Sequence, residues 1–475
     1  MNATPRVQSF PFTHSGLLAF ALLTGLAPLA AQSADWRITP SVTLGLGHSD
    51  NINLATPGNE VSDRVLEVTP GIDASYDGPR FETDITYRLQ ALDYRDDSSL
   101  DETYHQLAGR ATAWLVPDTF SLDALLSVRQ QVIDTTAPIP TSNIAGSGNL
   151  TDENTAYLSP RWTFRVSERA QADLRYATSR IDYDDASLTD STQEAIAAVV
   201  ESTSQPGHLY WAAKYRQSRI DFDSQEEIRF EQGTLEVGIP VFARSRFIVL
   251  VGDEKNTFRL SDGSDAPDDS YWMVGLRSQH AERYQLEVLA GERVFGNTAS
   301  LRWLQQGRRW RTEALYTEDY ITYAETRLEI DPRDPESILP GPGLGGVAPE
   351  VYLRERAQIG ATLERPKTTF RVSVYDEDRS YQTSNNRESL KGMELSVIWR
   401  AGSLTTFSLS GGRQENQLAG TNATDELKRV NLGVERRFGR RVQGNFYLRR
   451  ADQSSDVSTR EYVENSATLS ATLTF

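Results

Sequence analysis

Hydrophobic and polar side chains alternate along most of this chain. From residue 36 to 46 the even positions are apolar and the odd positions are polar or small, a pattern typical of β-strands with two unlike faces. The alternation resumes over residues 66–76, where Asp77-Gly78 predicts a tight hairpin turn, and again over residues 81–91. It continues to the last residue, Phe475. The sequence therefore predicts an all-β protein.

One unit recurs along the chain: a strand, a tight turn, a second strand and a longer polar loop. The predicted turns fall near Asp77, Pro117, Glu168, Ser204, Arg244, His280, Gly307, Pro366, Gly402 and Gly439. These hairpins, with one further strand at each end, predict 22 strands, and we expect an even number between roughly 18 and 22. The segment from Ala195 to Val200 is either one of these strands or a short helical turn within a loop.

Segment length and arrangement favour a membrane barrel over a soluble β-sandwich. Many segments run roughly 10 to 14 residues, near the length of a tilted strand that crosses a bilayer. Short turns on one side and long loops on the other are typical of outer-membrane barrels. Aromatic residues recur beside the turns and predict an interfacial girdle. They are Trp114, Phe120, Phe247, Tyr284, Trp399 and Phe438.

The two ends of the chain support the same interpretation. Residues 1–33 resemble a cleavable signal peptide, with Arg6 before a short apolar run and small residues after it. Residues 34–475 then form one barrel without a plug domain. The last strand ends at Phe475, which resembles the insertion signal read by the barrel assembly machinery. We expect this strand to pair with the one near Trp36, so that the antiparallel up-and-down barrel closes in the outer membrane with both termini in the periplasm.

Composition narrows the functional classes. The formal net charge is −17, which makes nucleic acid an unsuitable partner, and the chain has no cysteine for disulfides or thiol chemistry. Outside residues 1–33 the histidines form no metal motif and flank no nucleophile signature. His105, near Asp101 and Glu102, is the best candidate for a general base. We expect neither enzymatic activity nor a cofactor nor a catalytic metal.

The lumen is the candidate functional site, because a barrel of this size is too wide for side chains alone to fill. Charged residues at polar-face positions are predicted to line it. They are Arg161, Arg165, Arg175, Arg311, Arg371, Arg400, Arg449, Glu82, Asp84, Asp123, Glu287, Glu313 and Glu394. Such side chains either select a charged or sugar-rich solute or pair across strands and stiffen the wall. Two interpretations also stand for the long loop at residues 321–350: an inward constriction or a mobile extracellular loop. Its acidic residues, Asp331, Asp334 and Glu336, either bind a divalent cation or are simply solvated.

Three short motifs resemble a known family. They are Trp36-Arg37-Ile38-Thr39-Pro40-Ser41-Val42, Ser49-Asp50-Asn51-Ile52 and Val68-Thr69-Pro70-Gly71-Ile72. They are similar to the opening of β-barrel porin type 2 proteins, especially those found with exopolysaccharide loci and PEP-CTERM sorting systems. The resemblance implies an outer-membrane barrel with a role near polysaccharide export or surface assembly, and it implies no catalytic residues.

Two functions from different classes follow. The first is a channel or export component for exopolysaccharide or another large polar solute, with periplasmic export proteins as partners. The second is a structural or docking protein of the outer membrane, whose lumen is occluded and whose loops bind surface polymer or a secretion partner. An unobstructed interior favours the first, and loops packed across the lumen favour the second.

Overall fold

The fold is known from a computed structural model. It describes residues 36–203, 207–223, 226–242, 244–280, 283–328, 348–420 and 423–475. The predicted signal peptide, residues 1–33, lies outside the described residues. So do residues 329–347, which carry the Gly/Pro-rich stretch of the long loop and the acidic residues Asp331, Asp334 and Glu336.

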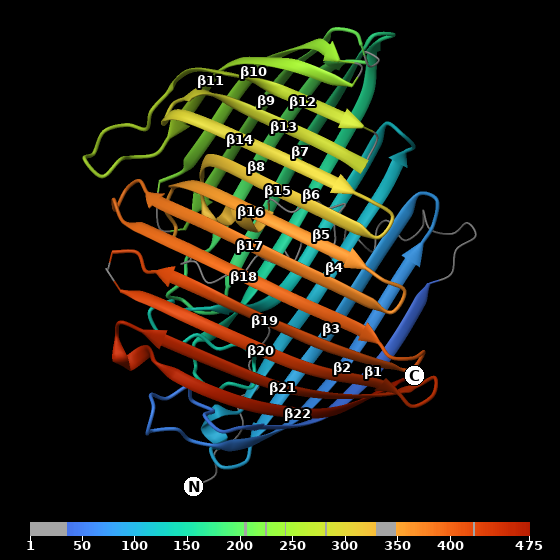
Figure 1. The fold of residues 1–475 in the computed structure, drawn as a ribbon, viewed down its shortest axis with the longest axis vertical. Coiled ribbons are helices and arrows are strands. Elements are labelled where there is room, and N and C mark those ends of the chain that lie inside the picture. The colour runs from blue at the N-terminus through green and yellow to red at the C-terminus, as the bar shows by residue number, and fades with distance from the viewer. Residues whose placement is uncertain are drawn as a thin grey trace.

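The described chain is almost entirely β-structure (Figure 1). The strands are β1 (Arg37–Ser49), β2 (Asp63–Asp77), β3 (Phe81–Tyr94), β4 (Glu102–Val116), β5 (Phe120–Val132), β6 (Leu150–Ser167), β7 (Ala170–Tyr183), β8 (Ser191–Ser202), β9 (Tyr210–Phe222), β10 (Ile228–Phe242), β11 (Ser245–Thr257), β12 (Asp269–His280), β13 (Tyr284–Arg293), β14 (Gly296–Gln306), β15 (Trp310–Ile321), β16 (Tyr352–Glu364), β17 (Thr368–Tyr381), β18 (Arg387–Arg400), β19 (Thr405–Gln417), β20 (Thr424–Arg437), β21 (Val442–Ser455) and β22 (Tyr462–Thr474). The helical segments are η2 (Ser98–Leu100), α2 (Tyr323–Leu328) and η4 (Ser458–Arg460). No helix among the described residues is long and apolar enough to cross a membrane.

The strands close into one barrel. The 22 strands form a single sheet in which each pairs antiparallel with its neighbours in sequence. The seam closes because β1 pairs with β22 as well as with β2, with Ser41 opposite Thr474. The Phe475 amide extends this seam by donating to the Pro40 carbonyl at 3.0 Å. The predicted closed, up-and-down, 22-stranded barrel is confirmed, and the described residues include no helical plug domain. Residues 195–200 lie within β8, so the strand interpretation of that segment is correct.

The two ends of the barrel differ. Short connections of two to four residues join β2 to β3, β4 to β5 and the later pairs in this series, except that residues 203–209 join β8 to β9, and we call that end of the barrel the turn end. The opposite end, which we call the loop end, carries the longer connections, including residues 133–149 and the segment between β15 and β16. Trp36 and Phe475 both lie at the turn end, because the chain makes an even number of crossings.

The outer face of the wall is apolar and exposed. Strand register assigns large exposed hydrophobic residues to one side, including Leu46, which is 63% exposed, and Ile359, which is 62% exposed. Residues at the alternate positions face inward and are mostly polar. An apolar surface that continues around a whole barrel is far larger than the patches that soluble monomers expose. It matches the lipid-facing band of a transmembrane barrel.

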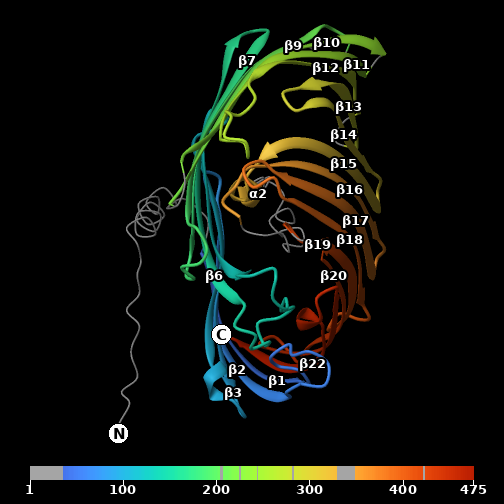
Figure 2. The same cartoon turned by 90° about the vertical axis from the view of Figure 1, so that its left-hand side faces the viewer.

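Most buried apolar side chains gather in several clusters inside the barrel rather than in one central core. Ile248, Leu250 and Met273 pack with two neighbours on the inner face of β11–β13, where the wall bends between its two long sides (Figure 2). Glycine permits the close strand approach there. A Cβ at Gly275 would lie 1.8 Å from the Val288 carbonyl oxygen, and one at Gly291 would lie 2.0 Å from that of Trp272.

One residue expected in the aromatic girdle faces the lumen instead of the lipid. Trp114 pairs with Ser121, and this register places its side chain on the inner face. Trp114 shares the inner face with Thr112 by regular alternation, and the β-bulge follows it, between Trp114 and Val116, so proximity to a turn did not predict the side on which this residue lies. Phe247, Trp399 and Phe438 are exposed, and register places Phe247 and Trp399 on the outer face, as expected of a girdle.

Candidate functional site

The inner face is continuous and polar across the seam that closes the barrel. Thr43 of β1 and Thr472 of β22 face each other there, with their hydroxyl oxygens 2.8 Å apart. Their neighbours Leu44 and Leu473 point to the opposite, apolar side. Each strand thus contributes alternate residues to a polar lumen wall, and this follows from the pleat of the strands alone.

Register places every predicted lumen-facing residue on this polar side. The placements follow from pairs such as Arg161 opposite Arg175, Arg371 opposite Thr362 and Arg400 opposite Thr406. The full set is Glu82, Asp84, Asp123, Arg161, Arg165, Arg175, Glu287, Arg311, Glu313, Arg371, Glu394, Arg400 and Arg449. Their effect on a solute stays a prediction.

Many of these residues pair with neighbouring strands. Arg161 of β6 bonds the Asp173 carboxylate of β7 at 2.7 Å, and Arg429 of β20 bonds that of Glu394 of β18 at 3.0 Å. Arg175 donates to the Ser159 hydroxyl at 2.8 Å and to the Tyr157 hydroxyl at 2.9 Å. Arg110 lies 3.7 Å from Asp84. Most of these contacts couple adjacent strands, and the Arg429–Glu394 pair spans β19 to join β18 to β20. Both kinds of contact are what the wall-stiffening interpretation requires.

A charged ladder crosses β9, β10, β12 and β13 near the turn end. Glu236 is only 1% exposed and accepts from Lys214 at 2.6 Å. Arg277 bonds both Glu236 and Glu287, so four charged groups alternate in sign across the wall. Of these four residues, the sequence analysis identified only Glu287. Alternation shows which residues lie on the polar face, but it does not show which charged side chains form ion pairs.

A second ladder crosses β16, β17 and β18 toward the loop end. Glu377 accepts from Arg356 at 2.5 Å and from Arg379 at 2.6 Å. Arg379 continues to Glu388 at 3.2 Å, and Glu388 also accepts from the Tyr381 hydroxyl at 3.0 Å. Both carboxylates are almost fully buried, so each depends on its cations to offset the loss of water. None of these residues was singled out from the sequence.

The β5–β6 loop, residues 133–149, folds into the lumen. Asn143 donates to the side-chain oxygens of Gln90, at 2.9 Å, and Gln130, at 3.0 Å. Ile139 reaches β21 and β22: its amide donates to Gln453 at 3.2 Å and its carbonyl accepts from Tyr462 at 2.5 Å. The loop therefore spans from its own strands to the wall on the other side of the seam. We call this segment the lumen loop.

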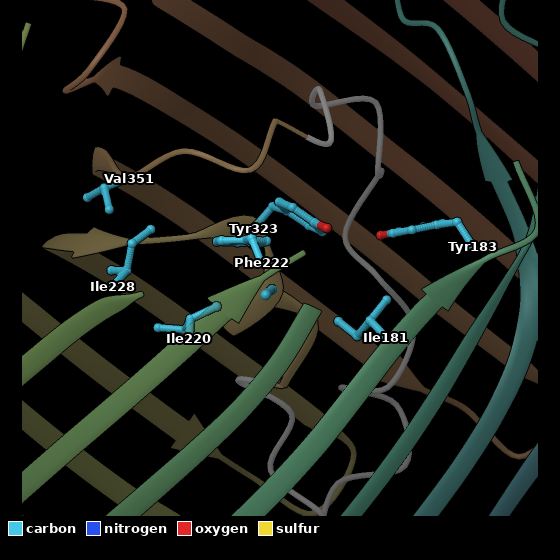
Figure 3. Close-up of a cluster of buried hydrophobic side chains, with 8 residues drawn as sticks. Ile181, Tyr183, Ile220, Phe222, Ile228, Tyr323 and Val351 are labelled. Carbon is cyan, nitrogen blue, oxygen red and sulfur yellow. The ribbon is translucent and has the colours of Figure 1, made fainter. Parts of the chain in front are cut away.

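A second inward segment starts directly after β15. Tyr323 and Ala324 of α2 pack against Ile181 of β7, Phe222 of β9 and Ile228 of β10 (Figure 3). The Tyr323 hydroxyl also donates to the Thr189 carbonyl at 2.8 Å. The described start of the predicted 321–350 loop is therefore a helix held against the inner wall. Figure 2 shows α2 between the two long sides of the barrel.

Two other loops meet over the loop end. The Ser261 amide of the β11–β12 loop donates to the Gln382 carbonyl at 2.9 Å, and the Thr383 hydroxyl donates to the Arg259 carbonyl at 3.0 Å. Beside α2, burial raises the pKa of the Asp190 carboxyl in the β7–β8 loop. The loop end is thus narrowed from several sides, whereas most connections at the turn end have two to four residues.

The described residues provide no group of three or more histidine or acidic side chains arranged to hold a metal ion. His105, the candidate general base, lies on the outward side of β4. Its Nδ1 atom is 2.8 Å from the Tyr87 hydroxyl, and Tyr87 pairs with the outward residue Ile72. This position lies outside the lumen where a polar substrate would pass.

No family model and no curated protein matches this chain. Among solved structures, it is similar to the siderophore receptor PirA from Acinetobacter baumannii, at 8% identity and a TM-score of 0.44, covering 92% of this chain and 80% of that chain. It is also similar to the FrpB iron transporter (F3-3 variant) from Neisseria meningitidis, at 9% identity and a TM-score of 0.44, covering 96% and 83%. OccK2 from Pseudomonas aeruginosa matches at 10% identity and a TM-score of 0.36, covering 92% and 98%. At this level of similarity none of them indicates a family, a solute or a partner for this chain. Its own strand pairing and apolar outer surface establish a closed, membrane-type β-barrel.

Proposed function

We propose that this protein is an outer-membrane channel or export component for a large polar solute, narrowed at its loop end by the lumen loop and by α2. The main observation that supports this proposal is the combination of a closed wall, a polar inner face and an apolar outer face. A wide lumen with fixed charges offers polar solutes a path that excludes lipid. In this proposal the turn end faces the periplasm, as short turns do in outer-membrane barrels.

Exopolysaccharide is the first solute to test. The opening motifs resemble those of barrels found with exopolysaccharide loci, and the inner face offers both arginine forks and carboxylates for hydroxyl-rich or acidic sugars. Periplasmic export proteins are the corresponding partners. A catalytic role is not part of the proposal, since His105 lies on the outward side of β4.

The lumen loop provides the sharpest test. Val132 and Leu150 are paired, and the Ile133 amide donates to the Asn149 carbonyl, so the two strands are already close enough for a short turn. We would replace residues 134–148 with Asn-Gly and record single-channel conductance in planar bilayers, with and without acidic and neutral polysaccharide. The expected result is a larger conductance than in the intact protein, together with weaker block by the polymer.

A matched variant separates the effect of the loop's length, which narrows the lumen, from the effect of its side chains. It keeps residues 134–148 at full length but replaces them with a Gly/Ser sequence, which removes the Asn143 amide donor and the apolar packing of Ile139. This variant should show unstable, flickering currents of intermediate size. If correctly folded intact protein and both variants are all silent, an open channel is excluded.

The second candidate is a structural or docking barrel with an occluded lumen. It is favoured by one observation: the lumen loop, α2 and the joined loops at Ser261 and Gln382 all cross or cap the loop end. Silent bilayers with folded protein, combined with polymer binding to whole protein, would support it.

A further inference from the structure

We propose that the turn end binds the headgroups of anionic phospholipids through a belt of unpaired cations on three hairpin turns. The belt consists of Arg308 and Arg309 between β14 and β15, Arg365 and Lys367 between β16 and β17, and Arg440 and Arg441 between β20 and β21. The inference concerns the outer rim of the barrel and does not depend on what passes through the lumen.

The six cations lack protein partners. All six are exposed, and none forms an ion pair with any residue that the structure describes. This contrasts with the inner wall, where arginines such as Arg277 and Arg379 each bond two carboxylates. The chain has a formal net charge of −17, so a cluster of basic residues without acidic partners is opposite in sign to the chain as a whole. No described residue neutralises this cluster, so it is available to bind an anion outside the protein.

The first two turns of the belt lie side by side along the rim. The Glu364 amide donates to the Arg309 carbonyl at 2.7 Å, which joins the first two turns of the belt. The Arg400 amide donates to the Lys367 carbonyl at 2.7 Å, which continues the rim toward β18. The first two turns of the belt are therefore neighbours, and the β20–β21 turn lies one hairpin further along the rim, beyond the β18–β19 turn.

The belt borders the lipid-facing surface. Trp310 directly follows Arg309 and is exposed on the outer face, and Phe370, three residues after Lys367 on β17, is an exposed aromatic residue of the same face. Phe438, 62% exposed, precedes Arg440, and the Arg436 guanidinium lies 5.7 Å from its ring centre. Exposed aromatics mark the boundary between hydrocarbon and headgroups. Arginines one or two residues beyond that boundary lie at the height of the phosphates.

The chemistry of arginine favours phosphate at this position. A guanidinium offers a planar fork that bonds two phosphate oxygens, and its long stem can follow the apolar surface while its head stays in the headgroup layer. Each cation near an anionic membrane surface adds to lipid binding. The belt therefore fits a patch of anionic headgroups in the leaflet that the turn end faces.

The test compares two variants of the full-length protein. The belt variant carries R308Q, R309Q, R365Q, K367Q, R440Q and R441Q. The control carries R95Q, K255Q, K391Q, R413Q, K428Q and R450Q, which removes equal charge near the loop end, where most of these cations lie beside carboxylates. Retention of phosphatidylglycerol and phosphatidylcholine by detergent-purified protein would be measured by native mass spectrometry. Heat-modifiable gel mobility would verify folding, and an R308Q/R309Q variant provides a milder change.

We expect the belt variant to bind phosphatidylglycerol about tenfold more weakly than the control, with phosphatidylcholine unchanged. The R308Q/R309Q variant should fall between them. The proposal is overturned if belt and control variants lose the anionic lipid equally, or if neither loses it. It is also overturned if the belt residues bind an acidic polysaccharide or an acidic peptide but not phosphatidylglycerol. Conductance in neutral bilayers is a separate readout, so a failure of the channel function would leave this result interpretable.

Discussion

Two buried carboxylates on the inner wall each bond two cations. Glu236 bonds Lys214 and Arg277, and Glu377 bonds Arg356 and Arg379. A carboxylate removed from water is costly unless its cations and hydrogen bonds compensate, so these groups stabilise the wall only as complete sets. At the scale of single residues, the polar lumen is therefore a fixed network, and removal of one member leaves the opposite charge without its partner.

Substitution of Glu377 by Gln should strongly destabilise the barrel. The change would leave Arg356 and Arg379 close together without the carboxylate that separates them, and Arg379 is 13% exposed at its side chain. We expect a loss of about 3 kcal/mol in the free energy of unfolding, measured by denaturant titration of detergent-folded protein.

The matched control is Glu313→Gln. Glu313 pairs with Arg311 at 3.1 Å, but both side chains are nearly half exposed, so water replaces the lost contact. We expect a change below about 1 kcal/mol. Equal effects of the two substitutions on the free energy of unfolding would show that burial of the β16–β18 ladder does not govern its contribution to stability.

At the scale of elements, the lumen loop is held by contacts to strands far away in sequence. Asn143 bonds Gln90 and Gln130, and Ile139 bonds Tyr462, a residue 323 positions later. The loop also packs its own apolar residues, such as Ile139 and Ala145, against Leu427 and Ala451. A loop with this many wall contacts should be ordered, unlike a solvent-exposed connection.

Substitution of Asn143 by Ala should loosen the lumen loop without unfolding the barrel. The loss of two donated hydrogen bonds leaves two glutamine oxygens without that donor, which weakens the docked state by about 1 kcal/mol or more. We expect faster amide hydrogen exchange in peptides covering residues 134–148 and unchanged exchange in β5 and β6. Asn431→Ala, which removes a wall contact to Ser410 away from the loop, is the control and should leave the loop peptides unchanged.

The elements themselves were predictable from sequence, and their long-range contacts were not. Period-two alternation is local, so it predicted even the weak strand β8 and assigned Arg161 and Glu394 to the polar face. The lumen loop carries no such period, and its position depends on partners such as Tyr462 that only closure of the barrel brings near. Trp114 was assigned to the girdle wrongly because its place beside a turn was used instead of its alternation with Thr112, which puts it on the inner face.

At the scale of the whole molecule, polarity is inverted relative to a soluble protein. Apolar side chains such as Val374, Leu395 and Leu469 face out and are about half exposed, whereas charged ladders face in. In water this arrangement would expose a continuous apolar band, and in a bilayer the same band is buried in hydrocarbon. A charge placed on the outer face should therefore be tolerated if that face meets water, and should destabilise the barrel if that face meets lipid.

A pair of adjacent substitutions in the middle of β17 distinguishes these environments. Val374→Arg places a charge on the outer face, 51% exposed in the isolated barrel, and in lipid it should cost about 2–4 kcal/mol because the guanidinium enters hydrocarbon. Ser373→Arg, one residue away, points into the lumen opposite Glu394 and should change stability little. Folding into lipid vesicles, followed by denaturant titration, measures both effects. If Val374→Arg were as well tolerated as Ser373→Arg, the outer face would not contact lipid, and the membrane-spanning assignment would fail with it.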